Sequence, residues 1–79
     1  MTWRIEWSHA AVAALRAIPW REAARVDRAV QRLATHHEGD LVRVKEHSTA
    51  ARLRVAPYVV YITLNPFDGV LAVWYVYRI

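Results

Sequence analysis

One stretch of the sequence decides the fold: Ala51-Arg52-Leu53-Arg54-Val55-Ala56-Pro57-Tyr58-Val59-Val60-Tyr61. It predicts a strand, a tight turn at the proline and a second strand. In the first strand, Leu53 and Val55 alternate with Arg52 and Arg54. Because successive side chains of a strand point to opposite faces, both arginines are expected on one face of the sheet. Two neighbouring guanidinium groups suit a phosphate-binding site, although exposed arginines are also common on plain solvated surfaces.

Upstream of this hairpin, the pattern predicts a short strand and a first helix. Apolar and polar residues alternate from Trp3 to Trp7, which is typical of a strand with one buried face. Ser8 is a good N-cap for a helix from His9 to Ile18. Pro19 ends that helix, because a proline pushes the residue before it out of the helical region.

A second helix is expected from about Trp20 to His36, with Gly39 as its stop. An apolar and a basic face both recur along it at helical spacing. The expected buried residues are Ala23, Val26, Val30 and Leu33, and the basic ones are Arg21, Arg25, Arg28 and Arg32. The basic face is interpreted either as a solvated outer surface or as a surface that attracts RNA or an acidic partner.

The rest of the chain predicts mostly strand. Residues 40–46 are expected to form a short extended or irregular connection. The strand that begins at Tyr58 is apolar on both faces, which is typical of a central position, and a turn at residues 65–69 leads into a last strand from Val70 to Ile79. The expected fold class is α+β: an N-terminal strand, a helical hairpin packed on one face, and a three-stranded antiparallel meander. The N-terminal strand is expected beside the C-terminal one.

Length and composition narrow the class of protein. Seventy-nine residues predict a single domain, residues 1–79, and the lack of cysteine excludes disulfides and thiolate metal sites. Neither a signal-peptide pattern nor a membrane-length apolar run is present, so a cytoplasmic protein without a membrane partner is expected. Eleven basic residues, ten of them arginine, leave a net charge of +4, which suits phosphate backbones and acidic proteins. Four Trp and four Tyr in so small a chain predict an exposed apolar patch and a protein partner.

The residues that carry chemistry form a basic and aromatic set. No serine has a matching His/Asp pattern, the two glycines form no phosphate loop and the four histidines are scattered, so neither a metal nor a cofactor is expected. Such a set can bind RNA and support attack of a 2′-hydroxyl on the adjacent phosphate. Arginine stabilises the developing charge but holds its proton too tightly to transfer it, so Tyr77 or His47 is expected to move protons. The set comprises Arg52, Arg54, Arg78 and Lys45, with Tyr58, Tyr61, Tyr75 and Tyr77 interleaved.

Four segments together resemble one family. They are Ala11 to Pro19, Ala23 to Ala34, Arg52 to Tyr58 and Val73 to Arg78. In order and spacing they resemble the RelE/ParE toxin superfamily of bacterial type II toxin–antitoxin systems, over nearly the whole chain. The resemblance implies the α+β fold above and a cognate antitoxin that wraps an acidic segment over the basic and apolar surface. A homodimer and a toxin–antitoxin hetero-oligomer both remain open.

The resemblance also implies one of two activities. A RelE-like toxin is an endoribonuclease that cuts mRNA at the ribosome and inhibits translation, whereas a ParE-like toxin inhibits DNA gyrase. Carried over by position, the catalytic residues are Arg52, Arg54 and Arg78, with Tyr77 added for proton transfer. The expected RNA-binding residues are Lys45, His47 and Tyr58.

Two departures from the family pattern bear on activity. The usual Gly-Asp-Tyr-Arg after the arginine strand is Ala56-Pro57-Tyr58-Val59, so an arginine that commonly contacts phosphate is a valine. The usual Gly-His-Arg near the end is Val76-Tyr77-Arg78. The prediction is therefore a RelE-like nuclease of weakened activity. The alternative is a ParE-like gyrase inhibitor or an inactive toxin homologue that acts by binding proteins.

Overall fold

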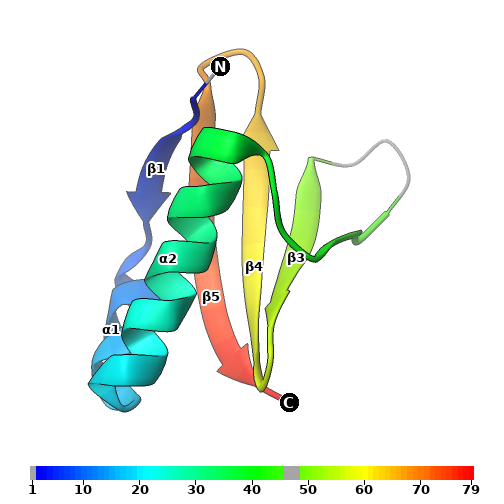
Figure 1. The fold of residues 1–79 in the computed structure, drawn as a ribbon. Coiled ribbons are helices and arrows are strands. Elements are labelled where there is room, and N and C mark those ends of the chain that lie inside the picture. Colours follow the sequence, from blue (N-terminus) through cyan, green and yellow to red (C-terminus); the bar gives the residue numbers. More distant parts are fainter. Residues whose placement is uncertain (1, 46–48) are drawn as a thin grey trace.

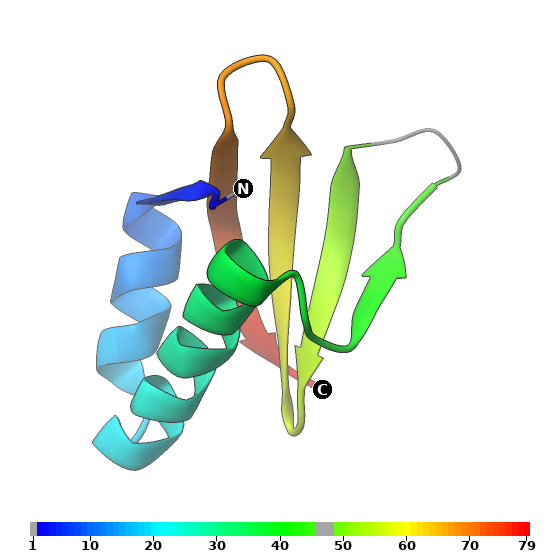
Figure 2. The same ribbon diagram turned by 45° about the horizontal axis from the view of Figure 1, so that its top comes forward.

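The computed structural model describes residues 2–45 and 49–79. Within them, the two helices and five strands are β1 (Arg4–Trp7), α1 (His9–Ala17), α2 (Trp20–His36), β2 (Leu41–Arg43), β3 (Ala50–Val55), β4 (Tyr58–Asn65) and β5 (Val70–Arg78) (Figure 1). The described strands form one sheet in the order β1-β5-β4-β3-β2, where β1 is parallel to β5 and all other neighbours are antiparallel. Both helices lie on the same side of the sheet (Figure 2). The expected α+β class and the place of the N-terminal strand are thus confirmed.

The helices begin as the sequence predicts, but α1 ends at Ala17 rather than Ile18, and the residue that ends α2 is not the predicted one. The Ser8 Oγ accepts a hydrogen bond from the Ala11 amide at 3.0 Å and donates one to the Trp74 carbonyl at 2.6 Å, which joins the start of α1 to β5. The second helix spans the predicted residues. Gly39 is not its stop, because His37 already takes the left-handed conformation (φ 58°) and its amide bonds the Leu33 carbonyl at 3.0 Å.

The core lies between α2 and the helix-covered face of the sheet. On α2, Val26, Val30 and Leu33 are buried as predicted, whereas Ala23 is half-buried and Ala34 is buried in addition. The sheet contributes Leu53, Val60, Ile62, Leu71 and Val73. Because Leu53 faces the helices, its neighbours Arg52 and Arg54 face away from them.

Strand β2 was not predicted from the sequence. It falls within the expected connection 40–46, of which Glu46 lies outside the described residues. β2 runs antiparallel to β3, with Leu41 opposite Leu53 and Val42 opposite Arg52. Three residues carry too little pattern to mark a strand, and the pairing with β3 holds it in place. The antiparallel meander therefore has four strands among the described residues.

An irregularity in β5 sets which aromatic residues face away from the helices. Tyr61 pairs with Tyr75 but Ile62 pairs with Val73, so Trp74 is an extra residue on β5, as in a β-bulge. The Trp74 indole Nε1 donates to the Thr63 hydroxyl at 2.8 Å. Because Ile62 is in the core, Thr63 lies on the opposite face, and the bulge brings Trp74 and Tyr75 there together.

Among the described residues, neither helix has the length and apolar character needed to cross a bilayer.

Candidate nucleic-acid interface

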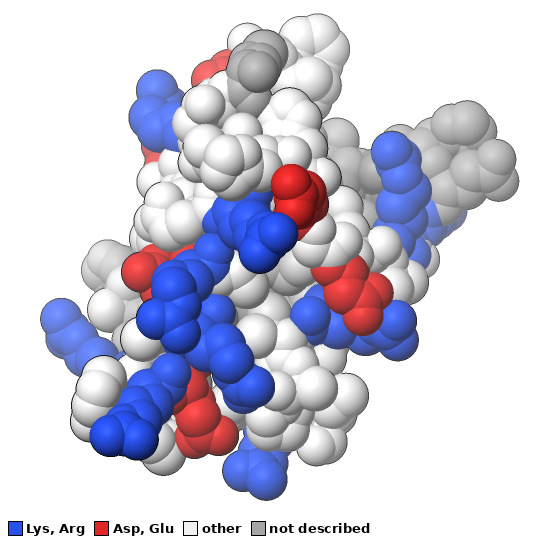
Figure 3. Space-filling view, viewed as in Figure 1, with Lys and Arg blue, Asp and Glu red and all other residues white. Residues whose placement is uncertain are grey.

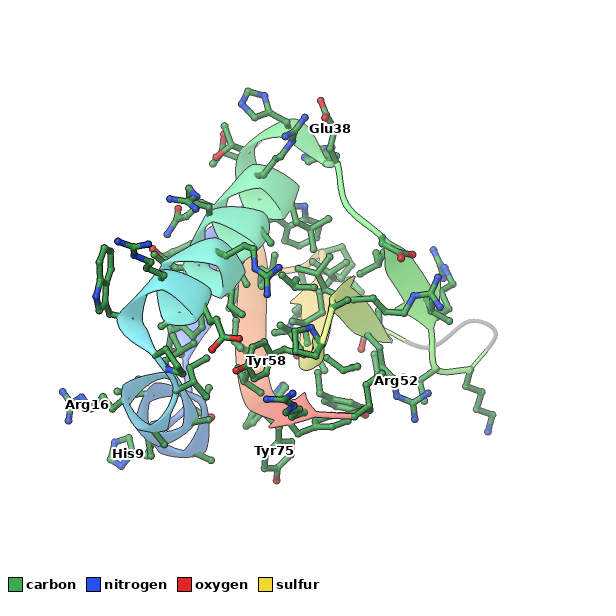
Figure 4. All side chains as sticks on the ribbon, turned by 60° about the horizontal axis from the view of Figure 1, so that its bottom comes forward. His9, Arg16, Glu38, Arg52, Tyr58 and Tyr75 are labelled. Carbon is green, nitrogen blue, oxygen red and sulfur yellow. The ribbon has the colours of Figure 1, made fainter. Side chains whose placement is uncertain are left out.

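One face of the sheet is left uncovered by the helices, and we call it the open face. Arg52 and Tyr75 point away from the helices on this side, whereas Tyr58 points toward α2 (Figure 4). The alternation of β3 and β4 and the bulge in β5 decide which side chains reach it. Three of its aromatic side chains are well exposed: Trp74 at 44%, Tyr75 at 56% and Tyr77 at 40%.

A first line of side chains crosses the open face through four neighbouring strands. Val42 lies opposite Arg52, Arg52 opposite Tyr61, and Tyr61 opposite Tyr75. Side chains that are directly opposite in a sheet are about 5 Å apart at their Cβ atoms, so Arg52 lies beside the Tyr61 ring. The rings of Tyr61 and Tyr75 are 6.2 Å apart between centroids and tilted by 57°. We call this line the Arg52 row.

Arg52 is the exposed cation of this row. No hydrogen bond or ion pair joins its guanidinium to any other residue in the part of the chain that the structure describes. A free guanidinium beside tilted tyrosine rings can hold a phosphate while the rings stack on bases.

A second line, the Arg54 row, lies next to the first. Arg54 is opposite Val59, and Val59 is opposite Tyr77. Unlike Arg52, Arg54 is engaged: its Nε and Nη2 donate to the two carboxylate oxygens of Asp40, each at 3.0 Å. These hydrogen bonds and the carboxylate charge raise the pKa of Arg54 above its ordinary value. Val59 is only 4% exposed, so the row has a buried valine between its arginine and its tyrosine.

Arg78 and Tyr58 do not belong to the open face. They lie opposite each other on β5 and β4, and Tyr58 is 3% exposed in the core on the helix side. Burial raises the pKa of Tyr58, and a hydrogen bond with Glu22 of α2 raises it further, while the nearby charges of Arg78 and Arg25 lower it. Because Tyr77 and Arg78 are neighbours on one strand, they point to opposite faces.

The expected catalytic set is therefore divided between two faces. Arg52, Arg54 and Tyr77 share the open face, and Arg78 lies on the other side of the sheet. Tyr58 is buried, so its ring has no surface on which an RNA base can stack. Arg78 and Tyr58 instead line a hollow of about 400 Å³ at the turn between the helices, together with Ile18 and Glu22.

Of the other two predicted RNA-binding residues, the structure describes only Lys45, toward the β2–β3 end of the sheet. Lys45 is exposed just beyond β2. His47 lies outside the described residues, so of the two proton-transfer candidates the structure places only Tyr77, on the open face. No group of three His, Asp or Glu side chains in residues 2–45 and 49–79 is arranged to hold a metal ion.

A separate basic surface follows the outer side of α2, where arginine side chains gather in one line (Figure 3). Two of its arginines have partners: Arg32 bonds the Glu38 carboxylate at 2.7 Å, and Arg21 lies over the Trp20 ring at 5.3 Å. The bond to Arg32 lowers the pKa of Glu38. This surface is in the helix layer, so it cannot contribute to the open face.

Sequence reasoning did not select four residues that the structure brings to the open face or its edge, and one of them, Trp74, reaches it through the bulge in β5. Tyr61 and Tyr75 appeared only in the general aromatic set, although counting outward from the Ala56-Pro57 turn places Tyr61 opposite Arg52. The contact between Asp40 and Arg54 had no signal in the sequence, because β2 was not predicted and no register was assigned to it.

Comparisons with known proteins give matches among solved structures alone: no protein-family model and no curated protein matches the chain. The RelBE2 toxin–antitoxin complex from Mycobacterium tuberculosis contains a chain with a TM-score of 0.83 and 14% identity, covering 100% of both chains. The RelE–RelB complex from Pyrococcus horikoshii gives 0.83 and 20%, over 99% of this chain and 96% of that one. The RelB–RelE complex from Methanococcus jannaschii gives 0.73 and 17%, over 91% and 87%.

These similarities extend over the strand, the helical hairpin and the antiparallel meander, and they confirm the fold that the sequence motifs implied. The chain has the fold of the RelE toxins of RelBE toxin–antitoxin complexes.

Proposed function

We propose that the chain is the toxin of a type II toxin–antitoxin pair and acts as a RelE-like endoribonuclease on mRNA at the ribosome. One observation carries the proposal: Arg52, which has no hydrogen-bond or ion-pair partner among the described residues, lies in a row with Tyr61 and Tyr75 on an uncovered sheet face. The likeness of the whole chain to toxins solved with their antitoxins supports the toxin class. Cytoplasmic location and inhibition of translation follow from this proposal.

Binding of single-stranded RNA uses the two kinds of side chain differently. Arg52 neutralises a backbone phosphate, and the exposed rings of Trp74, Tyr75 and Tyr77 offer surfaces to bases. Each stacked base contributes about 1–3 kcal/mol by the usual measure of alanine substitution. Stacking accepts any base, so these exposed rings select for single strands rather than for a particular sequence.

Cleavage needs an in-line transfer of a phosphoryl group. The 2′-oxygen forms a bond to the adjacent phosphorus and loses its proton, and the bond from phosphorus to the 5′-oxygen breaks as that oxygen gains one. The products are a 2′,3′-cyclic phosphate and a 5′-hydroxyl. Arg52 would stabilise the negative charge on the phosphoryl oxygens, and the Tyr77 hydroxyl is the proposed proton-transfer group.

The division of the arginines supports a weakened nuclease. Arg54 is held by Asp40, Arg78 lies on the other face, and Val59 replaces the arginine that the family pattern carries. Only Arg52 then stands free on the described open face. Removing a single charge-stabilising donor from an active site costs on the order of 10²-fold in rate, so a site with one free cation is expected to be slow.

The same division favours a second candidate function. A face with one free arginine and several exposed aromatic rings is also suited to binding protein. The chain would then be a ParE-like inhibitor of DNA gyrase, or an inactive toxin homologue whose remaining role is to bind its antitoxin. Under either function, the proposed partner is a cognate antitoxin with an acidic segment, in a toxin–antitoxin hetero-oligomer, and a homodimer of the free toxin is the other proposed assembly.

Regulated expression with mapping of mRNA 5′ ends tests the proposed activity. The wild type and Arg16→Ala, which removes an exposed arginine from α1 in the helix layer (Figure 4), are expected to arrest growth and create new 5′ ends. Arg52→Ala is expected to lose about 10²-fold of the cleavage rate. Absence of both growth arrest and new ends in the wild type contradicts the nuclease. Growth arrest without new ends, together with inhibition of gyrase supercoiling that survives Arg52→Ala, supports the second candidate.

A further inference from the structure

Asp40 and Arg54 form a two-point ion pair at the β2–β3 edge of the open face. The Arg54 Nε donates to Asp40 Oδ2 and the Nη2 to Oδ1, both at 3.0 Å. The main chain fixes the same two residues, because the Arg54 amide donates to the Asp40 carbonyl at 2.8 Å. Asp40 is thus placed beside Arg54 by backbone pairing as well as by its charge.

The Asp40 carboxylate occupies the edge of the guanidinium that best fits a phosphate. Two parallel N–H donors match two oxygens of a carboxylate or a phosphate in the same way. A phosphate at Arg54 must therefore displace Asp40 or accept the remaining, less well-matched N–H groups. The Asp40 charge also repels the phosphate at close range.

The ion pair is accessible enough for this exchange. The Arg54 and Asp40 side chains are 57% and 56% exposed, and ion pairs at such exposure hold their partners weakly. Arg52 has no such carboxylate beside it on β2, because the residue opposite it on that strand is the uncharged Val42. Within residues 2–45 and 49–79, the two arginines of this face are therefore in different states: Arg52 has no hydrogen-bond or ion-pair partner, and Arg54 is held by Asp40.

We propose that Asp40 is a built-in competitor for RNA phosphate at Arg54 and that it limits the affinity of the open face. The proposal rests on the RNA-binding role proposed above and adds how that role is restrained. When RNA binds at Arg54, the phosphate takes the place of the carboxylate. Without the carboxylate, Arg54 joins Arg52 as a second phosphate contact.

A double-mutant cycle tests the exchange. Binding of a fluorescent single-stranded RNA oligonucleotide is measured by anisotropy, at several salt concentrations, for the wild type, Asp40→Asn, Arg54→Ala and the double variant. Asp40→Asn is expected to bind about two- to fivefold more tightly, which is the size of effect known for exposed ion pairs. Its salt dependence is expected to steepen by about 0.7 in the slope of log K against log salt, the value of one added phosphate contact on a single strand. In the wild type, Arg54→Ala is expected to change RNA affinity little. In the Asp40→Asn background, it is expected to remove the whole gain in affinity.

Asp27→Asn is the matched control, because it removes an exposed carboxylate from α2. Circular dichroism and thermal melting check folding, and Asp40→Ser provides a second removal of the carboxylate. Equal affinity of wild type, Asp40→Asn and Asp40→Ser overturns the proposal, as does an equal gain from Asp27→Asn. The proposal is also overturned if Arg54→Ala lowers RNA affinity by the same factor in the wild type and in the Asp40→Asn variant. If Arg52→Ala leaves RNA affinity unchanged in every background, the proposed RNA-binding face itself fails. If Arg52→Ala weakens RNA binding but Asp40→Asn does not change it, only the competitor role of Asp40 is rejected.

Discussion

Tyr58 and Arg78 lie directly opposite each other on β4 and β5, on the face of the sheet that the helices cover. Burial and the interaction with Glu22 of α2 raise the pKa of Tyr58, and the charges of Arg78 and Arg25 lower it. The arginine that the family pattern would add to the phosphate site is thus part of the junction between sheet and helix. This placement separates the structural contacts of Arg78 from the RNA-binding role proposed for Arg52 on the open face.

Stability at alkaline pH is expected to depend on Tyr58. Burial and the bond to Glu22 raise its pKa in the folded protein above the ordinary value of 10.0. The folded state therefore favours the protonated phenol, so this contribution is complete below pH 10 and is lost as pH rises through the folded pKa. Urea unfolding of wild type and Tyr58→Phe at pH 8 and pH 11 is expected to show a smaller alkaline loss of stability in the variant.

Tyr75→Phe is the control for this experiment, because Tyr75 is 56% exposed and has no contact with Glu22 in the described structure. It is expected to keep the alkaline loss of the wild type. An equal loss in all three proteins contradicts the role given to Tyr58. Tyr58→Phe is also expected to leave RNA binding unchanged, since the ring is buried on the far face.

Most of the fold could be predicted from local patterns. The proline after Ile18, the Ser8 cap and the arginine hairpin each carry a signal within a few residues, and the structure confirms them. Strand β2 and the bulge at Trp74 could not be predicted, because both depend on pairing with a neighbouring strand rather than on their own residues.

The candidate site was less predictable than the fold. Alternation correctly placed Arg52 and Arg54 on one face. Strict alternation along β5 already separates Tyr77 from Arg78, so grouping them in one site followed the family pattern against the geometry of a strand. The occupation of Arg54 by Asp40 depends on a contact between residues 14 positions apart, which no local pattern reveals.

Ser8 is expected to stabilise the protein through two separate hydrogen bonds. Its hydroxyl caps α1 and also donates to the Trp74 carbonyl at the bulge. Ser8→Ala removes both and is expected to cost about 1–2 kcal/mol in the free energy of unfolding. Ser8→Asp keeps the acceptor that caps α1 but loses the donor to Trp74. Its stability should therefore lie between those of the wild type and Ser8→Ala. Equal stability of Ser8→Ala and wild type in urea unfolding would show that neither bond contributes.

Leu53 is expected to be a sensitive core position despite lying between two exposed arginines. Its side chain is 1% exposed and packs in the cluster with Val30 and Ile62. Leu53→Ala removes buried methyl groups and leaves a cavity, which costs about 2–5 kcal/mol in comparable cores. Val42→Ala, on the open face at 40% exposure, is expected to cost less than about 1 kcal/mol. Chemical unfolding of both variants checks the contrast, and similar losses would contradict the assignment of the two faces.

Arg52 is expected to make one phosphate contact of its own, independent of Asp40. Arg52→Ala should weaken binding of single-stranded RNA and lower the slope of log K against log salt by about 0.7, since one fewer counterion is released. Arg16→Ala removes the same charge from α1 and should leave the slope unchanged, because α1 lies on the helix side. Tyr75→Ala should weaken binding by about 1–3 kcal/mol without changing the slope, because stacking releases no counterion. Anisotropy titrations at four salt concentrations separate the two effects. A change of slope with Arg16→Ala equal to that with Arg52→Ala would mean that RNA responds to net charge and not to the open face.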